Sequence, residues 1–173
     1  HIYGLKSIKC TEFGVNYEIN NASFMQVNDD IKHKIYQAVF DAVSGDVVVD
    51  AYSGAGLLSA MLSKNAKQVY GIEIVPDAVK SADNLCRKNK ITNLKNICGD
   101  TAVELPKLAS KLNRFSLVLD PPRKGCDPKV IETILKSAPE KIVYVSCNPS
   151  TLARDLCVLK EKYNVVSITP FDM

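Results

Sequence analysis

From Val47 onward, short runs of Val, Ile and Leu alternate with longer stretches in which apolar side chains recur every three or four positions. The short runs are typical of buried strands, and the longer stretches are typical of amphipathic helices. Strands that alternate with helices in this way form a mostly parallel sheet with helices on both faces, which is an α/β fold. We expect strands at 47–52, 68–73, 94–98, 115–120, 142–146 and 165–169, and helices at 29–43, 57–64, 76–89, 101–112, 128–137 and 150–163.

The first 27 residues follow a different pattern. Gly4, Gly14 and the alternation of apolar and polar residues over 15–19 predict a small antiparallel hairpin. We interpret residues 1–27 as a partial β hairpin at the end of a preceding domain, and residues 28–173 as the α/β domain. The chain stops three residues after Pro170, so we expect this domain to be truncated at its C-terminus and to lack the final strand of its sheet.

Composition narrows the class of protein only slightly. The 173 residues are 46% hydrophobic and 24% charged, which fits one globular domain, and the net charge of +3 permits contact with a polyanion without specifying one. No two of the six cysteines are closer than ten residues, so we expect reduced thiols and no zinc or iron–sulfur site in this segment. No apolar run reaches the roughly 18 residues of a membrane helix, and we expect a soluble, cytoplasmic, monomeric protein.

A glycine pair follows the first strand of the expected sheet, where an open parallel sheet binds its ligand. Gly54 and Gly56 let the backbone approach a ligand closely, but a dinucleotide-binding loop would have a third glycine or alanine at position 59, which is Ser59. Asp50 would repel a pyrophosphate, whereas it suits a cationic ligand such as the ammonium and sulfonium of S-adenosylmethionine. A glycine turn beside a helix-capping aspartate is the structural alternative.

Three further acids follow strands. Glu73 stands twenty-three residues after Asp50, a spacing at which an acid accepts hydrogen bonds from the ribose hydroxyls of an adenosine ligand. Asp100 follows the next strand, where it would accept from the adenine amino group or else cap the following helix. Asp120 precedes two prolines that fix the backbone beyond the sheet, which gives a rigid frame for a carboxylate facing the crevice.

Cys147 is the candidate nucleophile. It leaves the fifth strand at the crevice, just before a helix that begins near Pro149, and the N-terminus of a helix favours a thiolate. The other five cysteines are expected to be small buried hydrophobic residues; they are Cys10, Cys86, Cys98, Cys126 and Cys157.

Five motifs stand in the following order along the chain: Phe24-Met25-Gln26-Val27-Asn28, Asp50-Ala51-Tyr52-Ser53-Gly54-Ala55-Gly56, Gly71-Ile72-Glu73, Asp120-Pro121-Pro122-Arg123-Lys124-Gly125 and Ser146-Cys147-Asn148-Pro149. Together they resemble the motifs of the S-adenosylmethionine-dependent RNA uracil-C5 methyltransferases, which make 5-methyluridine in ribosomal and transfer RNA. The resemblance implies a Rossmann-like class I methyltransferase fold, S-adenosylmethionine as cofactor and RNA as substrate. The continuation Thr151-Leu152-Ala153-Arg154-Asp155 is similar to the bacterial 23S rRNA branch, which favours ribosomal over transfer RNA.

The resemblance also implies roles for single residues. Gln26, Tyr52, Glu73 and Asp120 would contact the cofactor or the target base, and Cys147 would be the nucleophile. Gly54 and Asp100 are further candidates for cofactor binding from their positions after strands, not from the resemblance. The chemistry requires such a thiolate, because C5 of uracil becomes nucleophilic only after addition at C6. Asp120, protonated or bridged by a donor, would help to polarise the ring. Loss of the C5 proton then requires a base.

Two features depart from the family pattern. Its members carry an N-terminal RNA-binding domain, sometimes with an iron–sulfur cluster, and nothing in this chain corresponds to it. They also place a catalytic glutamate after the region equivalent to Phe171-Asp172-Met173, where this chain ends. The chain therefore resembles the catalytic domain without its general base.

Three other functions stay open. Cytosine-C5 RNA methyltransferases carry a second cysteine near the fourth-strand motif, and here none occurs until Cys126. Methyltransferases of base amines have an aromatic residue after the prolines, where this chain has Arg123. The third alternative is a fragment that binds cofactor or RNA without turnover.

Overall fold

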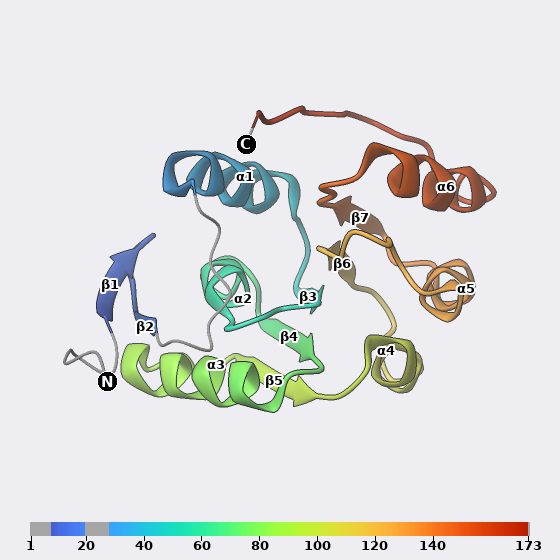
Figure 1. Cartoon of the computed structure of the whole chain (residues 1–173). Coiled ribbons are helices and arrows are strands. Elements are labelled where there is room, and N and C mark those ends of the chain that lie inside the picture. Colours follow the sequence, from blue (N-terminus) through green and yellow to red (C-terminus); the bar gives the residue numbers. More distant parts are fainter. Residues whose placement is uncertain (1–7, 20–27, 173) are drawn as a thin grey trace.

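In the computed structural model, which describes residues 8–19 and 28–172, a two-stranded hairpin stands beside a five-stranded sheet (Figure 1). The hairpin pairs β1 (Ile8–Glu12) with β2 (Val15–Ile19) in antiparallel fashion. The larger sheet is parallel throughout, in the order β5-β4-β3-β6-β7. Its strands are β3 (Val47–Ala51), β4 (Gln68–Glu73), β5 (Leu94–Cys98), β6 (Ser116–Leu119) and β7 (Lys141–Tyr144). The helices are α1 (Asp29–Ala42), α2 (Leu57–Leu62), α3 (Pro76–Asn89), α4 (Thr101–Ala109), α5 (Pro128–Ser137) and α6 (Pro149–Leu159).

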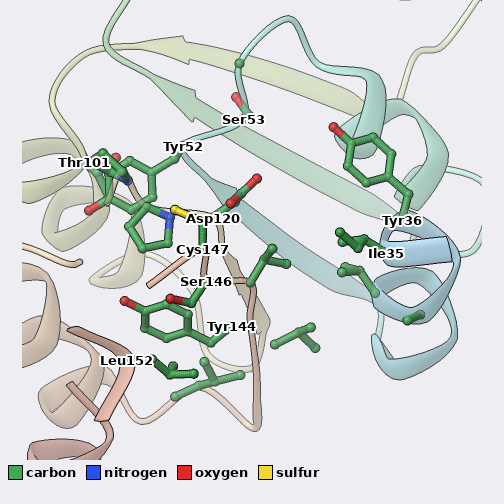
Figure 2. Close-up of a pocket in the computed structure, with 18 of the residues that line it drawn as sticks. Ile35, Tyr36, Tyr52, Ser53, Thr101, Asp120, Tyr144, Ser146, Cys147 and Leu152 are labelled. Atoms are coloured by element: carbon green, nitrogen blue, oxygen red, sulfur yellow. The ribbon is translucent and has the colours of Figure 1, made fainter. Parts of the chain in front are cut away.

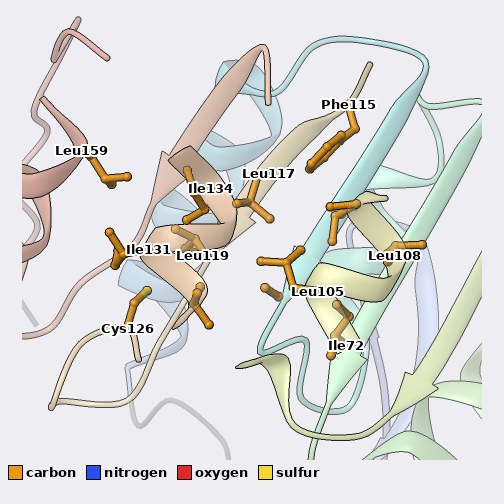
Figure 3. Packing of buried hydrophobic residues seen from close by; sticks show 14 residues of the cluster. Ile72, Leu105, Leu108, Phe115, Leu117, Leu119, Cys126, Ile131, Ile134 and Leu159 are labelled. Atoms are coloured by element: carbon orange, nitrogen blue, oxygen red, sulfur yellow. The ribbon is translucent and has the colours of Figure 1, made fainter. Parts of the chain in front are cut away.

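Helices cover both faces of the sheet because successive side chains of each strand point to opposite faces. Val48 and Val118 belong to one buried cluster, together with apolar residues of α1, α2, α3 and the hairpin. Their neighbours in the chain, Val49 and Leu117, belong to the other cluster, together with apolar residues of α4, α5 and α6 (Figure 3). The central strands β3 and β6 are buried on both faces and therefore consist largely of apolar residues, which is why the sequence predicts them well.

Three helices begin with a proline at the first helical position, where its missing N–H costs nothing. They are α3 at Pro76, α5 at Pro128 and α6 at Pro149. The Asn148 side chain caps α6 by accepting a hydrogen bond from the backbone N–H of Ser150 at 3.0 Å. This cap fixes the start of α6 directly after Cys147.

The parallel sheet with helices on both faces is confirmed, but the strand expected at 165–169 is wrong. After β7 the described residues contain no strand, and the segment after α6 runs past the end of the sheet towards α1 (Figure 1). Val166 is 95% exposed and Ile168 is 74% exposed. A run of β-branched residues is a strand only when a neighbouring strand pairs with its backbone, and this segment has no such partner in the described ranges.

The hairpin packs against the domain rather than standing apart from it. Buried Lys32 of α1 forms an ion pair with Glu12 of β1 at 2.9 Å, and Val15 belongs to the cluster under α1 to α3. Its interpretation as the end of a preceding domain stays a prediction. Within the described ranges, no helix has the length and apolarity that crossing a membrane requires.

Candidate active site

One open cleft of about 2350 Å³ reaches from the carboxyl ends of the strands along the edge strand β7 to α1 and the segment after α6. Strands β3 and β6 are neighbours although they are far apart in sequence, and the order of the sheet reverses between them. Such a switch point is where open α/β sheets bind ligands. Six of the seven residues predicted from the sequence line this cleft: Tyr52, Gly54, Glu73, Asp100, Asp120 and Cys147. The seventh, Gln26, lies outside the described residues.

Glu73 organises the glycine loop at the end of β3. One oxygen of its carboxylate accepts a hydrogen bond from the backbone N–H of Gly54 at 2.9 Å, and the other accepts from Val75 at 2.8 Å. Each carboxylate oxygen has a second lone pair, so Glu73 keeps acceptor capacity at the cleft. Gly56 has a φ of 84°, and a Cβ there would lie 2.7 Å from the Cβ of Ala82. The loop therefore packs closely on α3 and needs glycine at this position.

Asp50 does not face the cleft as the sequence suggested. It is 1% exposed, and its carboxylate accepts a hydrogen bond from the Ser59 hydroxyl of α2. Burial raises the pKa of Asp50 to about 7, the negative charges of Asp120 and Glu73 raise it as well, and the hydrogen bond from Ser59 opposes the shift. Asp50 thus belongs to the support of the glycine loop, and a ligand cation would have no direct contact with it.

Asp100 has the capping role that sequence reasoning left open. One oxygen of its carboxylate accepts from the backbone N–H of Ala102 at 2.9 Å, which caps α4. The side chain is exposed and lines the cleft at the end of β5. Capping therefore does not remove Asp100 from the cleft.

Asp120 and Cys147 follow the neighbouring strands β6 and β7 and both line the cleft (Figure 2). Burial raises the pKa of the Asp120 carboxyl to about 6, so this group exchanges a proton close to neutral pH. The Cys147 side chain is exposed and precedes the N-terminus of α6. Tyr52, which has a positive φ of 70°, and Thr101 lie on the far side of Asp120 from Tyr144 in this view.

All six cysteines are free thiols. Burial of Cys86 and Cys126 agrees with the sequence expectation, but Cys98 and Cys157 are exposed, which corrects it. Cys98 ends the edge strand β5, and Cys157 lies on an exposed part of α6, so neither position encloses its side chain. Among the described residues, no group of three or more His, Cys, Asp or Glu side chains is placed to hold a metal ion.

Several cleft residues were missed by sequence reasoning. Ile35 and Tyr36 reach the cleft from α1, a helix that precedes the whole sheet in sequence (Figure 2). Ile74 and Val75 follow Glu73 and line the cleft, and Ile74 is 60% exposed. The sequence contains a local signal for Ile74 and Val75, because this apolar pair directly follows an acid at the end of a strand. Nothing in the sequence marked Tyr36, because its place depends on packing between distant segments.

Comparison with solved structures shows the class I methyltransferase fold. Over 91% of this chain and 59% of the other, it resembles an S-adenosylmethionine-dependent methyltransferase from Agrobacterium tumefaciens with a TM-score of 0.69 at 12% identity, which concerns the fold alone. A second structure is the tRNA (uracil-54, C5)-methyltransferase of Pyrococcus abyssi in complex with S-adenosyl-L-homocysteine. It matches 90% of this chain and 38% of its own length, with a TM-score of 0.78 and 27% identity.

Sequence relatives lead to the family. The model of the tRNA (uracil-5-)-methyltransferase family matches residues 5–173. A protein named as an uncharacterized RNA methyltransferase of Enterococcus faecalis is 43% identical over 99% of this chain, and one from Clostridium acetobutylicum is 43% identical over 91%. The chain spans 38% and 35% of these relatives' lengths. The chain belongs to the tRNA (uracil-5-)-methyltransferase family.

Proposed function

We propose that this chain binds S-adenosylmethionine and carries the site that transfers its methyl group to C5 of a uridine in RNA. The observation that carries the proposal is the placement of Asp120 and Cys147. A proton-exchanging carboxyl and an exposed thiol lie at the ends of neighbouring strands and line the same cleft as the Glu73 loop. Membership of a uracil-5 methyltransferase family supports the same reaction.

The residues of the cleft fit the cofactor. Glu73 has lone pairs left for the ribose hydroxyls after it accepts from Gly54 and Val75. The exposed apolar side chains of Ile74 and Val75 would offer a surface for the adenine ring, and Asp100, which lines the same cleft, would accept from its amino group. When bound, S-adenosylmethionine supplies an electrophilic methyl group on a sulfonium. The S-adenosyl-L-homocysteine of the Pyrococcus abyssi structure supports this assignment.

Cys147 starts the reaction. Its thiolate forms a bond with C6 of uracil, and the electron pair of the C5–C6 double bond moves onto the C4 carbonyl as an enolate. Asp120 in its protonated form donates a hydrogen bond to this oxygen as charge develops, and its raised pKa keeps a fraction of the carboxyl protonated near pH 6 to 7. The enolate carbon C5 would then form a bond with the methyl carbon, while the bond between that carbon and the sulfonium sulfur breaks and leaves its electron pair on the sulfur as a neutral thioether.

Release restores the Cys147 thiolate. A base removes the proton from C5, the electron pair re-forms the C5–C6 double bond, and the bond between C6 and the Cys147 sulfur breaks. We assign no described residue to this base. The resemblance implies a catalytic glutamate in this role, and loss of a general base costs about 10²- to 10⁴-fold in rate.

The RNA is expected to be ribosomal. The sequence Thr151-Leu152-Ala153-Arg154-Asp155 favours this choice, whereas the Pyrococcus abyssi neighbour is a tRNA enzyme. Incubation of the intact protein with labelled cofactor and either 23S ribosomal RNA or transfer RNA decides between the two. Label in transfer RNA alone would refute the ribosomal assignment.

Substitution of the nucleophile tests the reaction itself. We expect Cys147→Ser to abolish methyl transfer to RNA while the affinity for S-adenosylmethionine, measured by calorimetry, stays the same. Cys157→Ser is the matched control, because Cys157 is also exposed and lies on α6 outside the cleft lining. Full turnover by Cys147→Ser would overturn the covalent route. Cofactor binding by the unaltered intact protein without transfer to any RNA would identify a binding module.

A further inference from the structure

One buried carboxylate in α6 joins three segments of the active site. Asp155 is 3% exposed and accepts four hydrogen bonds. Its Oδ2 accepts from the Tyr144 hydroxyl at 2.7 Å and from the backbone N–H of Cys126 at 2.9 Å. Its Oδ1 accepts from Nε and Nη2 of Arg154 at 2.9 and 2.7 Å. Asp155 therefore connects the end of β7, the loop after Asp120 and the helix after Cys147.

The loop after Asp120 is seated directly on α6. Nη2 of Arg154 donates to the carbonyl oxygens of Lys124 at 3.0 Å and Cys126 at 3.4 Å. The carbonyl oxygen of Arg123 accepts from Asn148 and from Thr151, each at 3.2 Å. The backbone of this loop is thus held by four side chains of one helix and its cap.

The approach is so close that only glycine fits at one point of the loop. Gly125 has a φ of +78°, and a Cβ there would lie 2.5 Å from Nη2 of Arg154 and 2.8 Å from Oδ2 of Asp155. The Tyr144 hydroxyl stays a donor to Asp155, because burial and this hydrogen bond both raise the pKa of Tyr144 far above its usual value. Loop, helix and strand therefore meet with little freedom to shift.

We propose that Asp155, together with Arg154, is a positioning residue that fixes the loop after Asp120 relative to Cys147. The inference rests on the proposed function, in which these two groups act on one base. Neither Asp155 nor Arg154 lines the cleft, so they act through the residues they hold. Displacement of a reacting group by about 1 Å costs on the order of 10²-fold in rate. Loss of the contacts made by Asp155 and Arg154 is therefore expected to slow the chemical step.

Substitution of Asp155 by asparagine, Asp155→Asn, is the sharpest test. The amide oxygen keeps an acceptor for Cys126 and Tyr144, whereas the amide nitrogen meets the donors of Arg154 and the negative charge is lost. In the intact protein we expect the single-turnover rate of methyl transfer to fall 10- to 100-fold. The dissociation constant for S-adenosylmethionine should change less than twofold, because the Glu73 loop is untouched. The matched control is Glu132→Gln, which removes an exposed carboxylate of α5 that pairs with Lys136.

Two further measurements keep the test decisive. Hydrogen exchange at the amide of Cys126 should become faster in Asp155→Asn, and this readout needs no RNA. If Asp155→Asn does not fold, Arg154→Lys is measured instead. Arg154 is half-exposed, and a lysine there keeps the positive charge but cannot donate both hydrogen bonds to Asp155. We expect a several-fold slower single turnover in this variant. A single-turnover rate within threefold of the unaltered protein in the folded variant would overturn the proposal. Failure of the proposed function shows separately, as turnover by Cys147→Ser.

Discussion

The carboxylate of Glu73 accepts a hydrogen bond of 2.9 Å from the backbone N–H of Gly54, nineteen residues earlier in the chain. This contact joins the end of β4 to the loop that follows β3. The residue expected to hold the ribose therefore also shapes the loop around the cofactor. A substitution at Glu73 is expected to affect both ribose binding and the shape of this loop. Comparison of Glu73→Ala with Glu73→Gln separates these two effects.

Glu73→Ala is expected to weaken binding of S-adenosylmethionine. It removes charge-assisted hydrogen bonds to the ribose, which are worth roughly 1.5 to 3 kcal/mol. Glu73→Gln keeps an oxygen for the Gly54 N–H but loses the charge, so its affinity should be intermediate. Titration calorimetry compares the three proteins. Equal affinity of Glu73→Ala and the unaltered protein would exclude the ribose role.

The thiols are expected to differ in reactivity. Burial raises the pKa of Cys126 to about 11 and also raises the pKa of Cys86, so neither forms the reactive thiolate at neutral pH. Among the exposed thiols, only Cys147 stands at the N-terminus of a helix in the cleft. Limited iodoacetamide labelling at pH 7, located by mass spectrometry, should modify Cys147 first. Earlier labelling of Cys98 or Cys157 would contradict the assigned nucleophile.

Stability is expected to fall as the pH rises from about 4 to 7. Burial raises the pKa of Asp50 to about 7 and of Asp120 to about 6, whereas both titrate near 3.8 in the unfolded chain. In this window the folded state binds more protons than the unfolded state, so the free energy of unfolding decreases as protons are lost. We expect a decrease on the order of 4 kcal/mol, measured by urea unfolding of the cofactor-free protein at pH 5 and pH 8.

Asp50→Asn isolates the contribution of one buried group. The variant keeps an acceptor for the Ser59 hydroxyl but no longer titrates, so its stability should depend less on pH. Asp41→Asn is the matched control, because Asp41 is an exposed carboxylate of α1. An unchanged pH dependence in Asp50→Asn would show that this carboxyl is not the group responsible.

The candidate site residues at the strand ends were predictable, because their placement depends on the local order of strands and loops along the sequence. Glu73, Asp120 and Cys147 each lie at or just after the end of a strand, and parallel strands bring their ends to one edge. Asp50 was misjudged although the signal was present. It lies inside a strand, one position from Val49, so its side chain points to the face opposite that residue, where α2 packs.

The remaining differences arise from distant contacts. Tyr36 enters the cleft from α1, and its place depends on how that helix packs on the completed sheet. The strand expected at 165–169 required a pairing partner that β-branched composition alone does not supply. The contacts of Asp155 with Tyr144 and Cys126 join residues 11 and 29 positions apart. Sequence reasoning gave Arg154 and Asp155 no mechanical role.

Gly125→Ala tests whether close packing of the loop after Asp120 on α6 is needed for catalysis. The added Cβ would meet Arg154 and Asp155 at less than 3 Å in a backbone conformation that disfavours alanine, which together cost about 1 to 3 kcal/mol of stability. Because Arg154 must move, single-turnover methyl transfer should slow as it does in Asp155→Asn. Gly45→Ala is the matched control: Gly45 also has a positive φ of 110°, but a Cβ there meets nothing closer than 3.6 Å. We expect Gly45→Ala to lower the unfolding midpoint in urea without slowing methyl transfer. If Gly125→Ala slows transfer no more than Gly45→Ala does, close packing of this loop on α6 has no part in catalysis.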